Sequence, residues 1–511
     1  MAPLSSWAQN WGVTLADGLQ LTEDSAGDWT LTMTEPAEQG TPLLTVPSHL
    51  ILTSDIQDDA FLPYYDEKDM RNVQTFMLTT LLETTQAESA TVSAHSFQQQ
   101  NYVLPEFMLT FKLLQEVYLG NNSRWNAWWQ SLPQTFSTGL YLDDVERRFV
   151  QSMAGDFLHT HELQYRAFLG LITRMMEAQQ QQQQLVTTTT QTTTTTSVIP
   201  NGFYLWLLET QDMEDEDGEN LFESLVKWAF TVVCTRSWRS PDRRHAHIIP
   251  LGDLANHDSQ KANLQPLFRP IDGAFQFYLT KDINQNLLSE QQQQTPSKLY
   301  LSYGSCSMPA RYLVLFGFCD ESAPFVDAHI DFLNDKEDNS HVGTGTCNEN
   351  GNQLNNVWPK SFLDQSKMVI STSNGAMSEE VWIAFLYKLL REKDPDALTT
   401  VREAYKGEYD ITTVEGDQMV EELWKKWEVT IGAEMQEYYR RLLETAFAPI
   451  MVTETKDLFD HPNLAMLVKY NLFMRDCFIR ALKHLNLLLD PATSEEDSAS
   501  KHQLGSGQDQ R

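Results

Sequence analysis

The chain has 511 residues and a formal net charge of −33, from 70 acidic and 37 basic residues. Such a charge repels phosphate backbones, so we do not expect nucleic-acid binding. It favours a basic partner, such as a lysine-bearing protein, although excess acid also serves solubility alone. Hydrophobic residues make up 41% and aromatic residues 11% of the chain, which excludes a disordered protein and allows two to four domains.

The cysteines, the first residues and the apolar runs indicate where in the cell the protein is expected. The five cysteines form no C-x-x-C pair, and no Cys/His cluster has zinc spacing. This sparse, odd number fits a reducing compartment, so we expect a cytoplasmic protein, with nucleus and plastid left open. We also expect a monomer. The start, MAPLSSWAQNWG, lacks the basic and apolar regions of a secretory signal. No apolar run reaches the ~18 residues of a membrane span, so we expect no membrane contact.

The N-terminal part alternates short strands with helical patterns. Residues 29–53 predict short strands separated by a turn at PAEQG. Residues 105–132 have helical spacing with a break at Gly120, and helical patterning resumes from 142 to about 176. Residues 178–197, AQQQQQQLVTTTTQTTTTTS, are of low complexity and predict a solvated insertion loop.

The middle of the chain returns to β character after one more helix. Residues 221–235, LFESLVKWAFTVVCT, predict that helix, and AHIIPLGDL at 246–254 is β-like. AFQFYLT at 274–280 and KLYLSYG at 298–304 flank a Gln-rich tract, which predicts a hairpin with the tract as its loop.

The remainder of the chain changes class. Residues 331–360 are polar and Gly/Asn-rich, which indicates a linker over 331–374. Residues 375–490 carry apolar residues at helical spacing. We therefore expect a separate helical domain there, followed by a disordered tail at 491–511. A β core interrupted by helices predicts an α+β fold for the part before it.

The candidate functional residues lie in three segments: TRSW at 235, PLGDLANH at 250, and LYLSYGSCSMPARYLVLFGF at 299. Tyr303 ends a β-like segment beside Gly304, where the backbone can turn sharply or approach a ligand. A tyrosine at a strand end is also an ordinary half-buried packing residue. From the residues alone the prediction is an α+β protein with a polar cleft.

PLGDLANH, LSYG and LVLFGF, in this order, resemble the SET-domain protein methyltransferases. They look most like the subgroup of the Rubisco large-subunit lysine methyltransferase and the actin-histidine methyltransferase. LLTVPSHLILT, SRWNAWWQSLPQTFST and the helical C-terminal region are similar to the same subgroup. The resemblance implies a SET-type β core over 10–330, a helical insert at about 65–230, and an all-α substrate-binding domain at 375–490.

The resemblance also implies a site for S-adenosylmethionine in a knot-like arrangement of the chain. Asn256 would bond the methionine end, and the backbone of His257 would hold the adenine edge. Phe318 would cover adenine, Arg236 would support the cofactor carboxylate, and Trp238 would wall the site. For Trp238 and Phe318, plain core packing is an equally open interpretation.

Tyr303 is the residue to which the resemblance gives the catalytic role, beside the cofactor. Its hydroxyl, with nearby carbonyl oxygens, would hold the incoming amine and the polarised methyl group. A dry channel would favour the neutral amine, because desolvation lowers an ammonium pKa. No metal is needed, and Asp253 would brace the local backbone.

Two departures from the family pattern keep alternatives open. The family's G-x-G is replaced by Gly27-Asp28-Trp29, and the usual Ser-Asn after Y-G is Ser307-Met308. A non-catalytic SET-fold binding protein is therefore one alternative. A histidine methyltransferase is another, but Trp238 and Gly252 stand where the actin-histidine branch has asparagine and tryptophan, which favours a lysine-bearing protein substrate.

Overall fold

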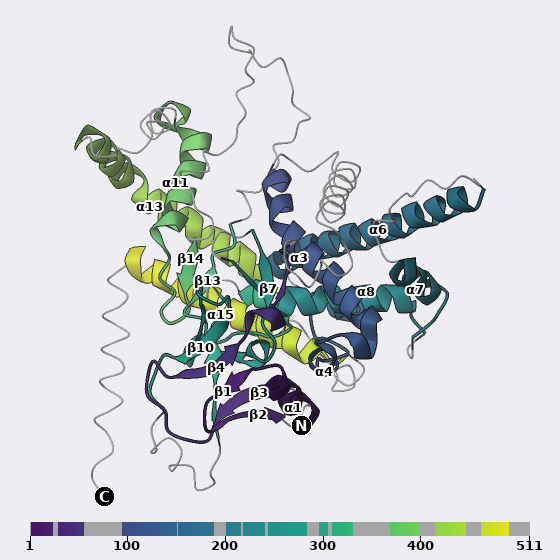
Figure 1. Cartoon of the computed structure of the whole chain (residues 1–511). Helices are drawn as coiled ribbons and strands as arrows, with labels where there is room; N and C mark the ends of the chain where they lie inside the picture. The colour runs from purple at the N-terminus through teal and green to yellow at the C-terminus, as the bar shows by residue number, and fades with distance from the viewer. Residues whose placement is uncertain are drawn as a thin grey trace, which may run out of the picture. The chain divides into compact units, whose positions relative to one another are not determined.

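A computed structural model provides the structure of the chain (Figure 1). It describes residues 2–23, 29–55, 95–150, 152–188, 201–215, 218–240, 244–283, 296–304, 309–330, 368–398, 414–445 and 461–489. The chain forms two compact units. The first comprises Met1–Asp143, Ala154–Gly304 and Arg311–Phe318, and the second comprises Asp144–Met153, Ser305–Ala310 and Cys319–Arg511.

Two small antiparallel sheets begin the first unit. One has the strand order β1-β4-β10-β9, and the other has the order β11-β3-β2. Their strands are β1 (Thr14–Leu15), β2 (Leu19–Glu23), β3 (Trp29–Met33), β4 (Pro42–Val46), β9 (Leu264–Phe268), β10 (Phe275–Leu279) and β11 (Ser297–Lys298). Leu31 and Leu44 belong to the buried core between elements, so the expected strands within 29–53 are confirmed.

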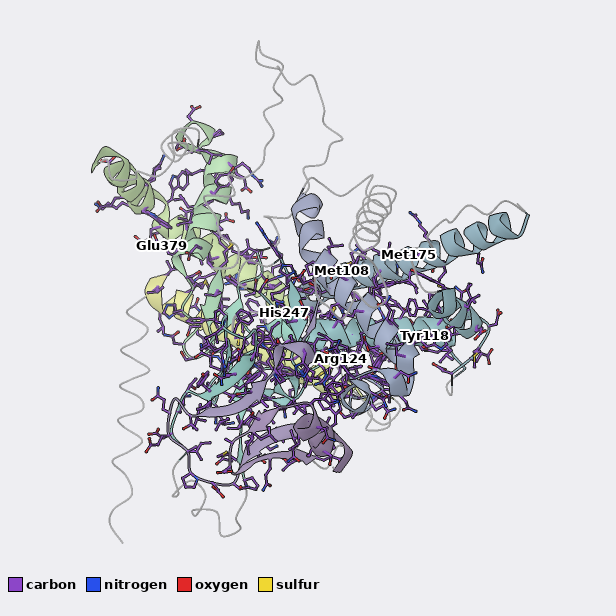
Figure 2. The ribbon with its side chains drawn as sticks, viewed as in Figure 1. Met108, Tyr118, Arg124, Met175, His247 and Glu379 are labelled. Carbon is purple, nitrogen blue, oxygen red and sulfur yellow. The ribbon has the colours of Figure 1, made fainter. Side chains whose placement is uncertain are left out.

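Two further sheets of the first unit carry the polar segments. The antiparallel order β5-β7-β6 joins β5 (Leu52–Thr53), β7 (Ala246–Ile248) and β6 (Ser237–Arg239). His247, labelled in Figure 2, lies on the central strand of this sheet. The other sheet is a parallel pair of β8 (Asn256–His257) and β12 (Tyr300–Leu301).

Helices of the first unit pack around aromatic side chains. They are α1 (Ala2–Asn10), α3 (His95–Leu119), α4 (Asn126–Trp129), α6 (Ser152–Thr188), α7 (Asn201–Gln211) and α8 (Leu221–Arg236). The Asn220 side chain caps α8 by accepting a bond from the Glu223 backbone. Phe230 on α8 packs on Phe107 of α3, with ring centroids 6.3 Å apart, and Figure 1 shows α3, α7 and α8 together.

The second unit combines one strand pair with long helices. Its elements are α5 (Asp144–Arg147), β13 (Phe325–Asp327), β14 (Val369–Ser371), α11 (Glu379–Lys393), α13 (Val414–Thr445) and α15 (Leu464–Leu489), and the short α10 (Pro309–Arg311) spans the boundary of the two units in the sequence. Tyr439 of α13 stacks on Phe478 of α15 at 5.6 Å. The α+β class is confirmed by these elements.

Three sequence-based expectations need correction. AFQFYLT and KLYLSYG do not form a hairpin, because β10 pairs with β4 and β9 while β11 and β12 pair with β3 and β8. The expected loop at 178–197 is wrong for 178–188, which continue α6, since glutamine is a good helix former. Within the expected linker, residues 369–371 form β14 against β13.

Several expectations lie outside the described residues. They are the rest of the low-complexity loop at 189–197, the linker at 331–367, the tail at 491–511, and the departures at Gly27-Asp28 and Ser307-Met308. In the part of the chain that the structure describes, no helix is both long and apolar enough to cross a bilayer.

Candidate active site

The two polar segments meet in the parallel pair β8–β12. Tyr300 lies opposite Asn256 and Leu301 lies opposite His257. The backbone N–H groups of Asp258 and Asn263 donate to Leu301 and Tyr300 carbonyls at 3.2 and 3.0 Å. This pairing joins segments more than forty residues apart, and it brings the chain after β12 alongside residues 255–257.

Leu251 marks the sharp turn that leads from β7 into this pair. Its φ is +70°, in the left-handed region that a bulky side chain rarely adopts, and it is fully buried. Such strain persists only where the surrounding structure fixes it, and it is common at functional sites. The turn delivers residues 252–257 to the strand pair.

Tyr303 is held just past the end of β12. Its hydroxyl donates a hydrogen bond to the Ala255 carbonyl at 2.8 Å. Burial raises the pKa of Tyr303 to about 12; the Arg236 charge opposes this and the Asp253 charge adds to it. The phenol is therefore neutral at physiological pH, with its proton directed to Ala255 and its oxygen lone pairs available to another group.

Aromatic side chains surround Tyr303 and His257. Ring centroids lie 5.1 Å apart for Tyr303 and Phe316, and 5.5 Å apart for His257 and Phe318. Tyr312 stacks on Phe318 at 5.5 Å, with the rings 13° from parallel. These side chains come from a π-helical turn, Tyr312–Phe316, and from the residues that follow it; such turns recur at functional sites.

Gly317 makes that turn possible. Its φ is +71°, and a Cβ there would lie 2.5 Å from the Ser137 carbonyl oxygen. Only glycine allows both the conformation and the close approach. The G-F of the LVLFGF motif is thus explained by packing: the glycine lets the chain turn so that the Phe318 ring reaches His257.

Asp253 is buried between a cation and an indole. Arg236 Nη1 donates to the Asp253 backbone carbonyl at 3.0 Å and to its carboxylate at 3.2 Å. Trp128 Nε1–H donates to the same carboxylate, 3.2 Å from Oδ2. Burial raises the pKa of Asp253, and Arg236 and Trp128 oppose that rise because they favour the charged form.

The guanidinium of Arg236 has a donor that is not used. Its Nε is buried and has no hydrogen-bond partner among the described residues. A buried donor without a partner costs about 1–3 kcal/mol unless a ligand or water satisfies it. The guanidinium is thus fixed by Asp253 through one nitrogen and open to a bond through another.

Trp238 is placed beside this network through Phe277. The two rings meet edge-to-face at 6.2 Å, and a Cβ at Gly252 would lie 2.1 Å from Phe277 Cζ. Residue 252 must therefore be small while Phe277 keeps its position. Trp238 is half-buried and packs against the core.

The structure thus brings Asn256, His257, Tyr303 and Phe318 together. Arg236 is bonded to Asp253, three residues before Asn256. Trp238 contacts the ring of Phe277. The sequence had not singled out Trp128, Tyr312, Phe316 or the Ala255 carbonyl. Trp128 and Ala255 carry no local signal, because their partners are distant in the sequence. For Tyr312 and Phe316 the aromatic spacing in ARYLVLFGF was a usable signal.

Comparison with known proteins supports the fold. No protein-family model and no curated protein sequence matches the chain. A solved structure of Rubisco LSMT bound to sinefungin and monomethyllysine matches with a TM-score of 0.51 at 13% identity, over 98% of this chain and 94% of that one. The chain has the SET-domain fold of Rubisco LSMT.

A second structure, of Rubisco LSMT bound to AdoMet, matches with a TM-score of 0.47 at 14% identity and covers 100% of this chain and 97% of that one. The family resemblance of the motifs agrees with the fold of the chain as the first of these matches shows it. At this level of identity the likeness concerns the fold, so the chemistry has to be argued from the side chains around β8–β12.

Proposed function

We propose that the chain is an S-adenosylmethionine-dependent protein methyltransferase that acts on a lysine side chain. The observation that carries the proposal is the Tyr303 hydroxyl, fixed on the Ala255 carbonyl at the end of the β8–β12 pair. The fold shared with Rubisco LSMT, a protein whose structure contains monomethyllysine, supports the same class of reaction.

The residues present suit the proposed cofactor. Arg236 offers a buried, unpartnered Nε to a carboxylate. The Asn256 side chain makes no hydrogen bond to any residue that the structure describes, so its amide is available to polar groups of the methionine end. Phe318 and Tyr312 present ring faces beside His257 for a flat base. When bound, the cofactor supplies a methyl group on a positively charged sulfur.

Tyr303 acts in this proposal by position and dipole. Because its proton is committed to Ala255, its oxygen lone pairs face the reacting groups as acceptors. An acceptor there stabilises the positive charge on a polarised methyl group and aligns the amine N–H groups. With its pKa raised to about 12, the phenol does not take the lysine proton at neutral pH. The protein supplies alignment rather than a covalent intermediate.

The amine must arrive uncharged for its lone pair to attack. The rings of Tyr303, Phe316 and Phe318 form an apolar surround that penalises an ammonium ion, which lowers the pKa of an entering lysine. The proton leaves with solvent before the side chain is enclosed. Lysine is favoured over histidine because Gly252 and Trp238 occupy the two positions that the histidine branch fills differently.

The test is methyl transfer from labelled S-adenosylmethionine to proteins of a cell lysate, followed by mass spectrometry of the labelled residue. Tyr303→Phe should lower the rate of transfer about 10²–10³-fold, the loss typical of removing one positioned polar group. Tyr300→Phe is the matched control, since Tyr300 lies on the same strand and opposite Asn256. That control should keep nearly full activity.

Other outcomes identify the alternatives. Equal labelling by wild type and Tyr303→Phe would contradict the role of the hydroxyl. Label on histidine would make the chain a histidine methyltransferase. Absence of transfer together with no thermal stabilisation by S-adenosylmethionine or its demethylated product would favour a non-catalytic binding protein; a cofactor at 100 times its Kd should add about 2.7 kcal/mol.

A further inference from the structure

The imidazole of His257 makes a bond that the proposed role of its backbone does not use. The backbone N–H of Tyr303 donates to His257 Nδ1 at 3.1 Å. The Tyr303 hydroxyl donates to Ala255, two residues before His257. Both ends of Tyr303, the backbone and the phenol, are therefore tied to the same three-residue segment, which also carries Asn256.

The hydrogen-bond pattern fixes the state of the imidazole. An N–H donor at Nδ1 requires a lone pair there, so the neutral ring carries its proton on Nε2. His257 Nε2 lies 3.1 Å from Ser259 Oγ, which can accept that proton's bond. The ring also packs on Tyr312 at 4.7 Å and on Phe318 at 5.5 Å. One tautomer and one orientation of the imidazole satisfy all of these contacts.

We propose that the His257 side chain is a positioning residue for methyl transfer: its neutral Nδ1 holds the Tyr303 backbone so that the phenol reaches Ala255 and the reacting groups. The kinetic part of this proposal rests on the proposed function. The alternative is that the bond only stabilises the fold. Its loss would then lower the free energy of unfolding without changing the position of the Tyr303 hydroxyl.

The geometry favours positioning because the backbone after Tyr303 turns away at once. β12 ends at Leu301, and Gly304 has a φ of +126°. Strand pairing therefore does not hold residue 303 in register. Among the described residues, the bond to Nδ1 is the one that fixes the Tyr303 amide. Small displacements of a reacting group cost large factors in rate, so this bond matters beyond its own strength.

Three variants of the full chain separate the possibilities. His257→Asn keeps an acceptor close to the position of Nδ1, and His257→Leu removes the acceptor. His159→Asn is the matched control, because His159 is an exposed histidine on α6. The first readout is hydrogen exchange of the Tyr303 amide by mass spectrometry of peptides covering 299–304, which needs neither cofactor nor substrate.

For exchange, His257→Leu should speed exchange of the Tyr303 amide roughly fivefold, the value of one lost hydrogen bond. His257→Asn should restore most of the protection, because its side-chain oxygen can accept the bond from the Tyr303 N–H. Unchanged exchange in a folded His257→Leu, or exchange as fast in His257→Asn as in His257→Leu, would overturn the proposal. If His257→Leu does not fold, His257→Asn decides: exchange of the Tyr303 amide more than about fivefold faster than in His159→Asn would overturn the proposal.

For methyl transfer to lysate proteins, His257→Leu should lower the maximal rate by on the order of tenfold to a hundredfold. The affinity for S-adenosylmethionine, measured by calorimetry, should change little because the backbone at 257 is kept. His257→Asn should recover part of the rate, because it keeps an acceptor for the Tyr303 N–H. An equal loss in both variants would assign His257 a purely structural role. If exchange of the Tyr303 amide changes in His257→Leu but the wild type transfers no methyl group, the proposed function is rejected. The bond from the Tyr303 N–H to His257 Nδ1 would still be supported.

Discussion

Asp253 and Asp327 are carboxylates of the two different compact units, and their surroundings differ: Asp253 is buried, whereas Asp327 is half-buried. Asp253 is bonded to the Arg236 guanidinium and to the Trp128 indole, which come from two different helices. Asp327, at the end of β13, accepts one bond among the described residues, from the His329 backbone N–H at 2.7 Å. The first site therefore contains a compensated charge, and the second relies on a single backbone donor.

The surroundings of Asp253 suit the binding of a polar ligand, whereas those of Asp327 serve packing. Arg236 forms an ion pair with Asp253 through Nη1. Its Nε has no hydrogen-bond partner among the described residues. Around Asp327 the backbone carbonyls of Ala328 and His329 accept bonds from the hydroxyls of Tyr439 and Tyr438. Burial raises the pKa of Asp327 to about 6, so the fold there tolerates the carboxylate best when it is neutral.

The largest effect on this comparison should come from Arg236→Met. The change leaves the Asp253 carboxylate buried without its cation, which should cost about 3–5 kcal/mol in the free energy of unfolding. Urea unfolding of the full chain measures this loss. In Arg236→Met/Asp253→Asn the negative charge is removed as well, while the new side-chain amide oxygen can still accept from Trp128, so most of the loss should be recovered. A double variant as unstable as the single one would contradict a charge-compensated site.

A smaller effect is expected from Trp128→Phe. The change removes one ring of the buried indole together with a donor to the Asp253 carboxylate. A hydrogen bond to a charged group contributes about 1.5–3 kcal/mol, so unfolding in urea should show a loss in that range. Trp129→Phe, on the same helix and half-buried, serves as the control. Equal losses in both variants would indicate that packing, rather than the bond to Asp253, stabilises this region.

The smallest effect has the opposite sign, and it concerns Asp327. Its folded-state pKa, about 6, lies above the ordinary value of 3.8 because burial disfavours the charged carboxylate. Between these values the unfolded chain binds fewer protons than the folded chain, so stability falls as pH rises from about 4 to 6. Asp327→Asn has no such slope, and it should be more stable than wild type by roughly 1–3 kcal/mol at pH 7.

Hydrogen exchange of peptides from β13 and α13 at about pH 4 and pH 7 measures this locally. At the lower pH the two proteins should be equally protected, because the carboxyl is then neutral in both folded states. A variant that is less stable than wild type at pH 7 would show that Asp327 is compensated by a cation after all, and the contrast with Asp253 would disappear.

Much of the fold could be predicted from local patterns. The helix at 221–235 and the strands within 29–53 follow from apolar periodicity and turn residues, and both are confirmed. The hairpin around the Gln-rich tract was wrong because proximity in sequence was taken as pairing, whereas both strands have distant partners. Low complexity was taken as loop, although a glutamine run can extend an existing helix.

The candidate site was only partly visible in the sequence. Asn256, His257 and Tyr303 stand in recognisable motifs, and the parallel pairing places them together. Trp128, which bonds Asp253 from 125 residues away, and Phe277, which requires a small residue at 252, could not be found this way. Their roles depend on contacts between distant elements, which neither periodicity nor spacing encodes.

The central claim, that the β8–β12 pair and Tyr303 form a methyl-transfer site, is tested most directly by a crystal structure of the chain with S-adenosylhomocysteine. We expect the sulfur of the ligand to lie next to the Tyr303 hydroxyl, its carboxylate to contact Arg236, and its base to lie against Phe318. A ligand bound away from residues 255–257 and 303, or a crystal grown at saturating ligand with none at this site, would contradict the account.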